Sequence, residues 1–227
     1  MSTPQTKEKQ YSELLDVKNS VGLTSLGVMT NQVWHDDPRR LTFLLSRYKF
    51  VSKMFAGKAN VAELGCGDAF GSRIVQQDVK ALSVFDFDPL FIADVNERKS
   101  AKWPFKAATV HDALTGPLPG GPFDGIYSLD VMEHIPAADE NTYLTNIKKS
   151  LAPHGAFIVG MPSLESQTYA SPQSKIGHIN CKSGNDFKAV LSQHFGNVFL
   201  FSMNDEVVHT GFSPMAHYLI GLCVEPR

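Results

Sequence analysis

The sequence predicts an α/β fold, in which a doubly wound and mostly parallel sheet is covered by helices on both faces. Short apolar runs alternate with segments of helical periodicity from residue 60 onward, and a glycine-rich turn follows the first run. Strands separated by single helices favour parallel pairing. Two further apolar runs, residues 197–203 and 217–224, have no helix between them. They predict an antiparallel hairpin at the sheet edge.

The individual elements follow from these patterns. We expect parallel strands at residues 60–64, 81–86, 107–110, 123–129 and 156–161, and helices near residues 71–77, 89–98 and 139–151. Ser183 precedes Asp186 by three residues, a capping-box spacing that predicts a helix from there to about residue 195. With the two last apolar runs, the sheet has seven strands. In such sheets, ligands bind beyond the carboxyl ends of the strands.

A helical segment precedes the sheet. Residues 1 to about 20 predict a frayed tail or a short helix. Asp37 and Pro38 are typical of a helix start, with Asp as the N-cap residue and Pro in the first turn. Apolar residues then follow at helical spacing as far as Gly57. We expect one compact domain overall, in which residues 1–57 cover the site and residues 58–227 form the sheet with its helices.

Composition argues against several classes of protein. The 227 residues are 43% hydrophobic and 19% charged, which is typical of an ordinary globular core. The net charge is −2 and the basic residues are dispersed, so we expect no nucleic-acid partner. No apolar segment is long enough for a signal peptide or a membrane span, and the three cysteines form no CxxC pair. We therefore expect a cytoplasmic protein without a membrane partner.

The glycine-rich turn is the first candidate site. Glu63 ends the first strand, and Gly65, Cys66 and Gly67 form the turn. Glycine tolerates positive φ and lets the backbone approach a ligand closely. The carboxylate of Glu63 would repel a pyrophosphate, but it could hold a positively charged ligand group.

The next two strands each end in an acidic residue or are followed by one. Asp86 ends the second strand about 20 residues after the glycines, where a carboxylate can accept hydrogen bonds from a ribose diol. Asp88 is better placed as the N-cap of the following helix. Asp112 follows the third strand, where it could contact a ligand or cap a turn of its own loop.

The fourth strand completes the pattern, because it runs into Leu129 and Asp130 and then into Glu133 and His134. Together these four segments, over residues 60–162, resemble the class I S-adenosylmethionine-dependent methyltransferases. The resemblance implies a Rossmann-like fold with S-adenosyl-L-methionine as cofactor. The third glycine of the family's first motif is replaced by Ala69 in this sequence.

The resemblance also implies a set of cofactor-binding residues at the carboxyl ends of the strands. Glu63 would hold the amino group of the cofactor through water or backbone, Asp86 would hold its ribose and Asp112 its adenine amino group. The full set is Glu63, Gly65, Cys66, Gly67, Asp86, Phe87, Asp112, Ala113, Leu129 and Asp130.

Methyl transfer to an oxygen needs a group that removes the acceptor's proton. His134, His178 and His209 are the candidate catalytic bases, and His134 leads because the family places this loop opposite the sulfonium. Residues 203–212 are polar and too long for a tight turn, so we expect them to cover the acceptor pocket. Arg47 could pair with the carboxylate of the cofactor. No spacing typical of metal ligands is present, and no metal is expected.

We therefore expect an enzyme that transfers a methyl group to an oxygen or nitrogen atom of a small polar acceptor. A sugar or glycan precursor is one candidate. Two alternatives stay open. A non-catalytic S-adenosylmethionine-binding protein would keep the same turn. An NAD-dependent dehydrogenase would need Gly-x-Gly-x-x-Gly, whereas Gly65, Gly67 and Gly71 contain one residue too many.

Overall fold

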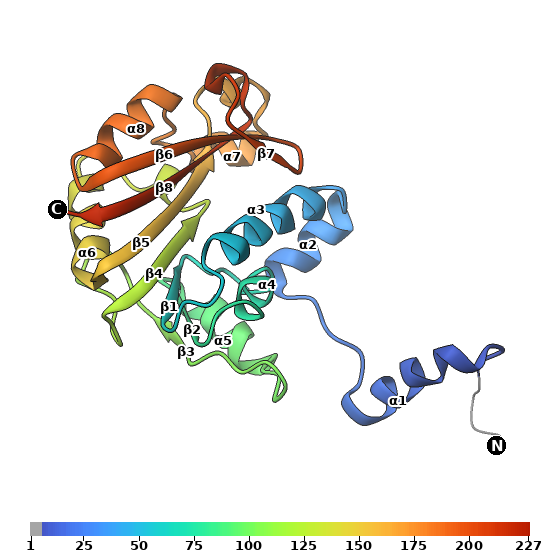
Figure 1. The fold of residues 1–227 in the computed structure, drawn as a ribbon. Coiled ribbons are helices and arrows are strands. Elements are labelled where there is room, and N and C mark those ends of the chain that lie inside the picture. Colours follow the sequence, from blue (N-terminus) through green and yellow to red (C-terminus); the bar gives the residue numbers. More distant parts are fainter. Residues whose placement is uncertain (1–5) are drawn as a thin grey trace.

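A single eight-stranded sheet forms the centre of the computed structural model, which describes residues 6–227 (Figure 1). The strands are β1 (Val61–Leu64), β2 (Leu82–Asp86), β3 (Ala107–Val110), β4 (Phe123–Leu129), β5 (Leu151–Pro162), β6 (Phe195–Asn204), β7 (Val207–His209) and β8 (Tyr218–Pro226). Their order in the sheet is β3-β2-β1-β4-β5-β8-β6-β7. Strands β1 to β5 are parallel, and β8 is antiparallel to both β5 and β6.

The predicted α/β class, with a mostly parallel sheet and antiparallel strands at the carboxyl end, is confirmed. The predicted number of seven strands is wrong. The eighth strand is β7, which pairs antiparallel with the end of β6. A two-residue turn joins them, and Asp205 adopts a left-handed conformation there with φ 49°. The start of the polar segment 203–212 is therefore a tight hairpin and not the long connection expected.

Helices cover both faces of the sheet. They are α1 (Ser12–Val21), α2 (Val28–Asp36), α3 (Arg40–Met54), α4 (Ser72–Gln76), α5 (Pro89–Glu97), α6 (Glu140–Ser150), α7 (Pro172–Gly177) and α8 (Gly184–Ser192). Short 3₁₀ helices are η1 (Lys9–Tyr11), η2 (Met132–His134), η3 (Glu165–Tyr169) and η4 (Ser213–Met215). No helix within residues 6–227 combines the length and the apolar character needed to cross a lipid bilayer.

Alternation along the strands divides the core into two layers. Ala62 and Leu64 of β1 pack in one cluster with the apolar faces of α6 and α8. Val61 points the other way, into a second cluster with α3, α4 and α5. Successive side chains of a strand point to opposite faces, so Glu63, between Ala62 and Leu64, is directed at the layer that contains α3.

Two of the predicted helix starts are confirmed. The carboxylate of Asp88 accepts a hydrogen bond from the backbone N–H of Leu90 at 2.8 Å, which caps α5. The hydroxyl of Ser183 accepts from the N–H of Asp186 at 3.2 Å, which caps α8. Such side-chain caps satisfy N–H groups that have no partner within the helix.

The segment before the sheet differs from its prediction. Helix α3 begins at Arg40, and Asp37 instead accepts from the N–H of Arg39 at 3.3 Å in the preceding turn. Helix α1 stands apart from the sheet in Figure 1 and buries none of its side chains. Any cover that residues 1–57 provide for the site therefore comes from α2 and α3. Residues 1–5 of the predicted tail lie outside the described residues.

Candidate active site

The glycine-rich turn leaves β1 in the conformation that the sequence predicts. Gly65 and Gly67 have φ values of 76° and 52°, and the N–H groups of Gly65 and Cys66 donate to the carbonyl of Phe85 at 2.8 and 3.0 Å. A Cβ atom on Gly65 would lie 2.1 Å from a methyl carbon of Val131. Ala69 keeps the left-handed backbone, with φ 53°. The backbone of the turn therefore keeps a left-handed conformation at this position although the third glycine is replaced by Ala69.

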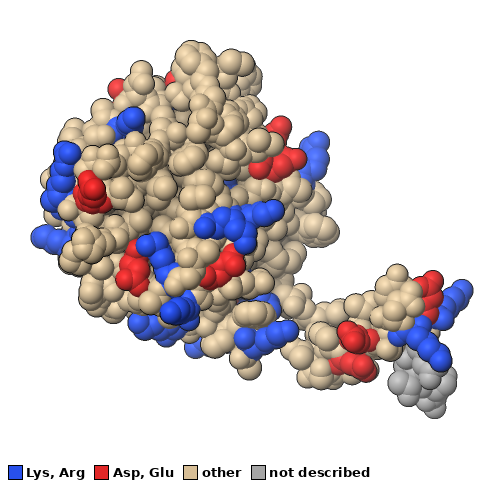
Figure 2. All heavy atoms as spheres, viewed as in Figure 1, with Lys and Arg blue, Asp and Glu red and all other residues tan. Residues whose placement is uncertain are grey.

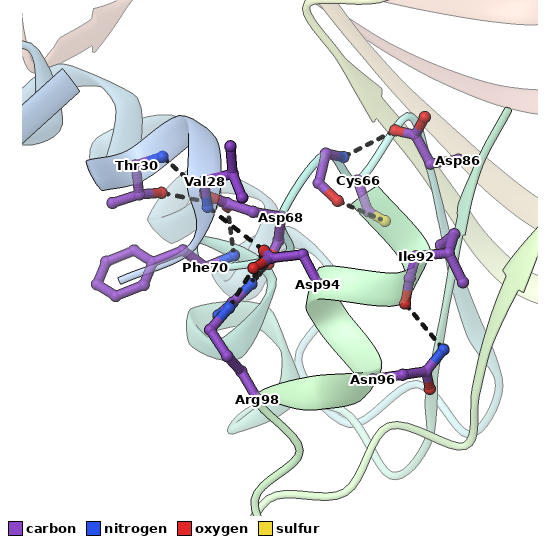
Figure 3. Close-up of polar contacts among 11 residues, drawn as sticks. Val28, Thr30, Cys66, Asp68, Phe70, Asp86, Ile92, Asp94, Asn96 and Arg98 are labelled. Carbon is purple, nitrogen blue, oxygen red and sulfur yellow. Dashed lines mark hydrogen bonds and ion pairs between the residues drawn. The ribbon is translucent and has the colours of Figure 1, made fainter. Parts of the chain in front are cut away.

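Asp86 lies at the end of β2 and is joined to this turn. One carboxylate oxygen accepts from the N–H of Gly67 at 2.8 Å, and the other accepts from the N–H of Asp88 at 3.0 Å. Figure 3 shows the carboxylate beside the turn that contains Cys66. A carboxylate oxygen has two lone pairs, so each oxygen of Asp86 can accept one further hydrogen bond.

Glu63 lies below the turn, where its side chain has no direct access to a ligand. Its side chain is completely buried, and its two oxygens accept from the hydroxyls of Tyr48 and Tyr127 at 3.0 and 2.7 Å. Burial raises the pKa of Glu63 to about 7, against the lowering effect of its hydrogen bonds. With no exposed surface, Glu63 cannot touch the amino group of a ligand. Its role is to support the glycine-rich turn through its hydrogen bonds to Tyr48 and Tyr127.

The residues expected around the adenine are in different surroundings. Phe87 exposes 72% of its surface just beyond β2, whereas Ala113 is buried. The carboxylate of Asp112 accepts from the N–H of Leu114 at 2.8 Å. Asp112 therefore caps the turn of its own loop, and its contact with the adenine stays a prediction.

Asp130 follows β4 and forms an ion pair across the site. Nη1 of Arg47 lies 2.9 and 2.7 Å from the two carboxylate oxygens of Asp130. The guanidinium group stacks over the ring of Tyr218 at 3.7 Å from its centroid. Asp130 adopts φ 58°, and the neighbouring Leu129 is buried. Arg47 was expected to pair with a carboxylate of the cofactor, but its partner here is Asp130.

Helix α2 packs onto the glycine-rich turn, a contact that the sequence did not predict. The N–H and the hydroxyl of Thr30 donate to the two oxygens of Asp68 at 2.7 and 3.1 Å (Figure 3). Arg98 pairs with Asp94 at 2.7 Å and also donates to the carbonyl of Asp68. The position of Asp68 inside the turn could have indicated a structural role for its carboxylate. Its partner Thr30, however, is remote in sequence and could not be predicted.

The three candidate histidines divide into two groups. His134 and His178 lie together, with ring centroids 5.3 Å apart. His209 is in β7, where its Nδ1 accepts from the N–H of Gly211 at 2.9 Å and its Nε2 lies 2.8 Å from an oxygen of Asn204. Because both ring nitrogens of His209 are engaged within its own hairpin, it has no free lone pair for an acceptor's proton. The expectation that His209 is a base is therefore not supported.

A cavity of about 200 Å³ adjoins the Arg47–Asp130 pair. It lies between α3 and the ends of β6 and β8, and its lining residues are Phe43, Arg47, Met203, Asp205, His217 and Tyr218. Two of them belong to the segment 203–212.

Comparison with known proteins agrees with this geometry. A family model described as a methyltransferase domain matches residues 62–159. A probable S-adenosylmethionine-dependent methyltransferase of Mycolicibacterium smegmatis (strain ATCC 700084 / mc(2)155) is 25% identical over 116 residues, which cover 51% of this chain and 42% of the relative. The chain thus matches less than half the length of this curated relative.

Solved structures show the same fold. The N-methyltransferase NodS from Bradyrhizobium japonicum WM9, in complex with S-adenosyl-L-homocysteine, superposes with a TM-score of 0.61 at 20% identity, covering 85% of this chain and 90% of NodS. The methyltransferase domain of bacterial CtHen1-C has a TM-score of 0.66 at 13% identity, covering 83% and 100%. The chain therefore has the fold of these methyltransferases, and its residues 62–159 match a methyltransferase domain.

Proposed function

We propose that this protein transfers the methyl group of S-adenosylmethionine to an oxygen or nitrogen atom of a small polar acceptor. The observation that carries the proposal is the junction of Asp86 with the glycine-rich turn, where Asp86 accepts from the N–H of Gly67 at 2.8 Å. This junction places a carboxylate beside the glycine-rich turn.

The residues present fit the cofactor. Gly65 and Gly67 give the turn its positive φ values, and Asp86 keeps lone pairs that can accept from the ribose hydroxyls. The exposed ring of Phe87 offers an apolar face for the adenine. When bound, the cofactor supplies an electrophilic methyl group on a sulfonium. The chain's own residues orient the acceptor and exclude water.

The cavity of about 200 Å³ beside Arg47 is our candidate for the acceptor pocket. Its walls combine the rings of Phe43 and Tyr218 with the polar groups of Arg47, Asp205 and His217. A pocket of this size and polarity suits a small acceptor that carries hydroxyl or amino groups, such as a sugar. For an oxygen acceptor, His134 and His178 are the candidate proton acceptors.

Surface charge supports a small acceptor over a nucleic acid. On the face drawn in Figure 2, basic and acidic side chains lie interspersed over the body of the molecule. The net charge of the chain is −2. A nucleic-acid surface would need a concentrated basic footprint. The three cysteines are free, which supports our proposal of a cytoplasmic location.

The test is calorimetry followed by a turnover screen. We expect S-adenosyl-L-homocysteine to bind the purified protein, whereas NAD does not. In the screen, a panel of sugars, amines and carboxylates is incubated with S-adenosylmethionine, and release of the demethylated cofactor is measured. Binding of NAD alone would support the dehydrogenase alternative and overturn the proposal.

His134→Ala separates a catalytic role from a role in cofactor binding. We expect turnover to fall at least tenfold while the affinity for S-adenosyl-L-homocysteine stays within about twofold. His154→Ala is the matched control, because His154 is exposed on β5. Equal turnover in the two variants would place the proton acceptor elsewhere. Cofactor binding without turnover of any acceptor would favour the non-catalytic alternative.

A further inference from the structure

Three potential metal ligands that are separated in sequence meet beside the candidate active site. Glu133 and His134 belong to η2, and His178 directly follows α7. One potential ligand atom from each of the three lies within 4.8 Å of those from the other two. The two segments are joined by backbone hydrogen bonds, since the N–H of Asn180 donates to the carbonyl of Glu133 at 2.9 Å.

The carboxylate of Glu133 has no partner of its own. The side chain is completely buried, and neither of its oxygens has a hydrogen-bond partner among the described residues. An isolated carboxylate in such surroundings is costly unless it is paired with a cation or coordinates a metal. Burial raises the pKa of Glu133, and the charge of Asp130 raises it further, whereas Arg47 lowers it. Because Arg47 and Asp130 already neutralise each other, Glu133 remains the uncompensated group.

Both histidines are oriented in the way that metal ligands usually are. Nδ1 of His134 lies 2.8 Å from the carbonyl oxygen of Gly177, and Nδ1 of His178 lies 2.9 Å from the amide oxygen of Gln167. A carbonyl oxygen can only accept a hydrogen bond, so in both rings Nδ1 carries the proton. Nε2 then keeps its lone pair. A metal-binding histidine is typically fixed by this kind of outer hydrogen bond.

We propose that Glu133, His134 and His178 form a binding site for a divalent transition-metal ion. Two imidazole nitrogens and one carboxylate favour zinc, manganese, iron or cobalt over magnesium or calcium, which prefer oxygen ligands. Three protein ligands leave at least one coordination position open to water or another oxygen ligand. His134 is exposed, so an ion can reach the cluster from solvent.

The spacing is compatible with a single ion after a small adjustment. Bonds from zinc to nitrogen or oxygen of about 2.0–2.2 Å place the ligand atoms of one ion roughly 3 Å apart. The observed limit of 4.8 Å therefore requires movement on the order of 1 Å. The ring of His134 is exposed, so it can shift while keeping its hydrogen bond to Gly177, whereas Glu133 is held within the core.

The metal site depends only on these three side chains and not on the proposed methyl transfer. In a metal-bound protein, the Nε2 atoms of His134 and His178 would hold the ion and could not accept a proton. An acceptor oxygen bound at the open position would then lose its proton more easily, because a divalent cation stabilises the oxyanion.

The experiment uses untagged protein that has been treated with a chelator and dialysed. Zn²⁺, Mn²⁺ and Co²⁺ are titrated separately by calorimetry, and Co²⁺ binding is also followed by its visible absorption. We expect one ion per chain and a rise in Tm on addition of metal, because a ligand that binds only the folded state stabilises it. Weak metal sites in proteins have dissociation constants of up to about 1 mM. Absence of binding by all three ions at about this concentration would overturn the proposal.

Variants assign any bound ion to this site. Glu133→Gln and His178→Ala should weaken metal binding at least tenfold, whereas Glu63→Gln, a matched change at another fully buried carboxylate, should not. Circular dichroism checks that each variant folds. His134→Ala is the variant least expected to disturb folding, because His134 is exposed. Metal binding that is unchanged in Glu133→Gln, His134→Ala and His178→Ala would place the ion elsewhere and overturn the proposal.

Discussion

Thr30 holds Asp68 with two hydrogen bonds, from its backbone N–H at 2.7 Å and from its hydroxyl at 3.1 Å. Both residues are buried, and they join α2 to the glycine-rich turn across 38 positions of sequence. The carboxylate of Asp68 also accepts from the N–H of Phe70 at 3.1 Å, within the turn itself. One side chain thus fixes the shape of the turn and the helix above it.

Replacing Asp68 by Ala should therefore loosen α2. Hydrogen bonds to charged groups contribute more than those between neutral groups, so we expect a loss of unfolding free energy on the order of 2–3 kcal/mol. Amide hydrogen exchange over residues 28–36 should accelerate. Thr30→Val is the matched control, because it removes one of the two bonds and should have a smaller effect. Unchanged exchange in Asp68→Ala would mean that α2 is held by other contacts.

The burial of Glu63 predicts an unusual dependence of stability on pH. Its pKa is raised from 4.5 to about 7 in the folded protein, chiefly by burial. Between these values the folded state binds more protons than the unfolded state, so the free energy of unfolding falls as pH rises. The stabilisation is fully present below about pH 4.5 and is lost by about pH 7. The total change is on the order of 3 kcal/mol.

Urea unfolding at intervals between pH 4.5 and 7.5 measures this effect. Glu63→Gln provides the control, because the amide can still pair with the hydroxyls of Tyr48 and Tyr127 but does not titrate. The difference between wild type and Glu63→Gln should change by the stated amount across this range. Parallel curves for the two proteins would show that Glu63 keeps an ordinary pKa.

Two aspartates that are two residues apart should respond differently to replacement. Asp86 faces the glycine-rich turn, whereas Asp88 caps α5. Asp86→Ala should weaken binding of S-adenosyl-L-homocysteine at least tenfold, equivalent to about 1.4 kcal/mol. Asp88→Ala should leave that affinity within about twofold and lower the stability by about 1 kcal/mol. Calorimetry and thermal unfolding measure the two quantities, and equal affinities would remove Asp86 from the cofactor site.

Arg47 and Asp130 should show a measurable coupling energy. The side chain of Arg47 is 14% exposed and that of Asp130 is 34% exposed. Solvent at Asp130 screens the pair, so we expect a coupling on the order of 1–2 kcal/mol in a double-mutant cycle with Arg47→Ala and Asp130→Ala. Arg47→Lys keeps the charge but loses the planar group that stacks over Tyr218. It should be less stable than wild type. Additive losses in the cycle would contradict the coupling.

The parts of the fold that could be predicted from sequence are local in sequence. The strand, the turn and the acidic residue at the next strand end are each encoded by adjacent residues, and their positions were predicted correctly. Strand β7 was missed because it has only three residues and follows two charged ones. The complete burial of Glu63 was not predicted, because it depends on alternation along β1 and on the cover that α3 provides.

The contacts that could not be predicted join remote segments. Thr30 meets Asp68, and His178 meets His134, only after the chain has folded. Periodicity identifies which face of an element is apolar, but it does not identify which loop lies opposite another. No metal ligands were expected because Glu133 and His134 are adjacent, while the third potential ligand is in a different loop.

The insertion of β8 between β5 and β6 has a consequence for synthesis of the chain. Val224 of β8 pairs with Ala156 of β5 on one side and with Asn197 of β6 on the other. Both neighbours leave the ribosome before residues 218–226 do. Until β8 emerges, β5 presents an open edge and the β6–β7 hairpin has no place in the sheet, and open edges favour aggregation. The nascent protein thus depends on β8 to close the sheet, and chaperones would act most usefully just before β8 emerges.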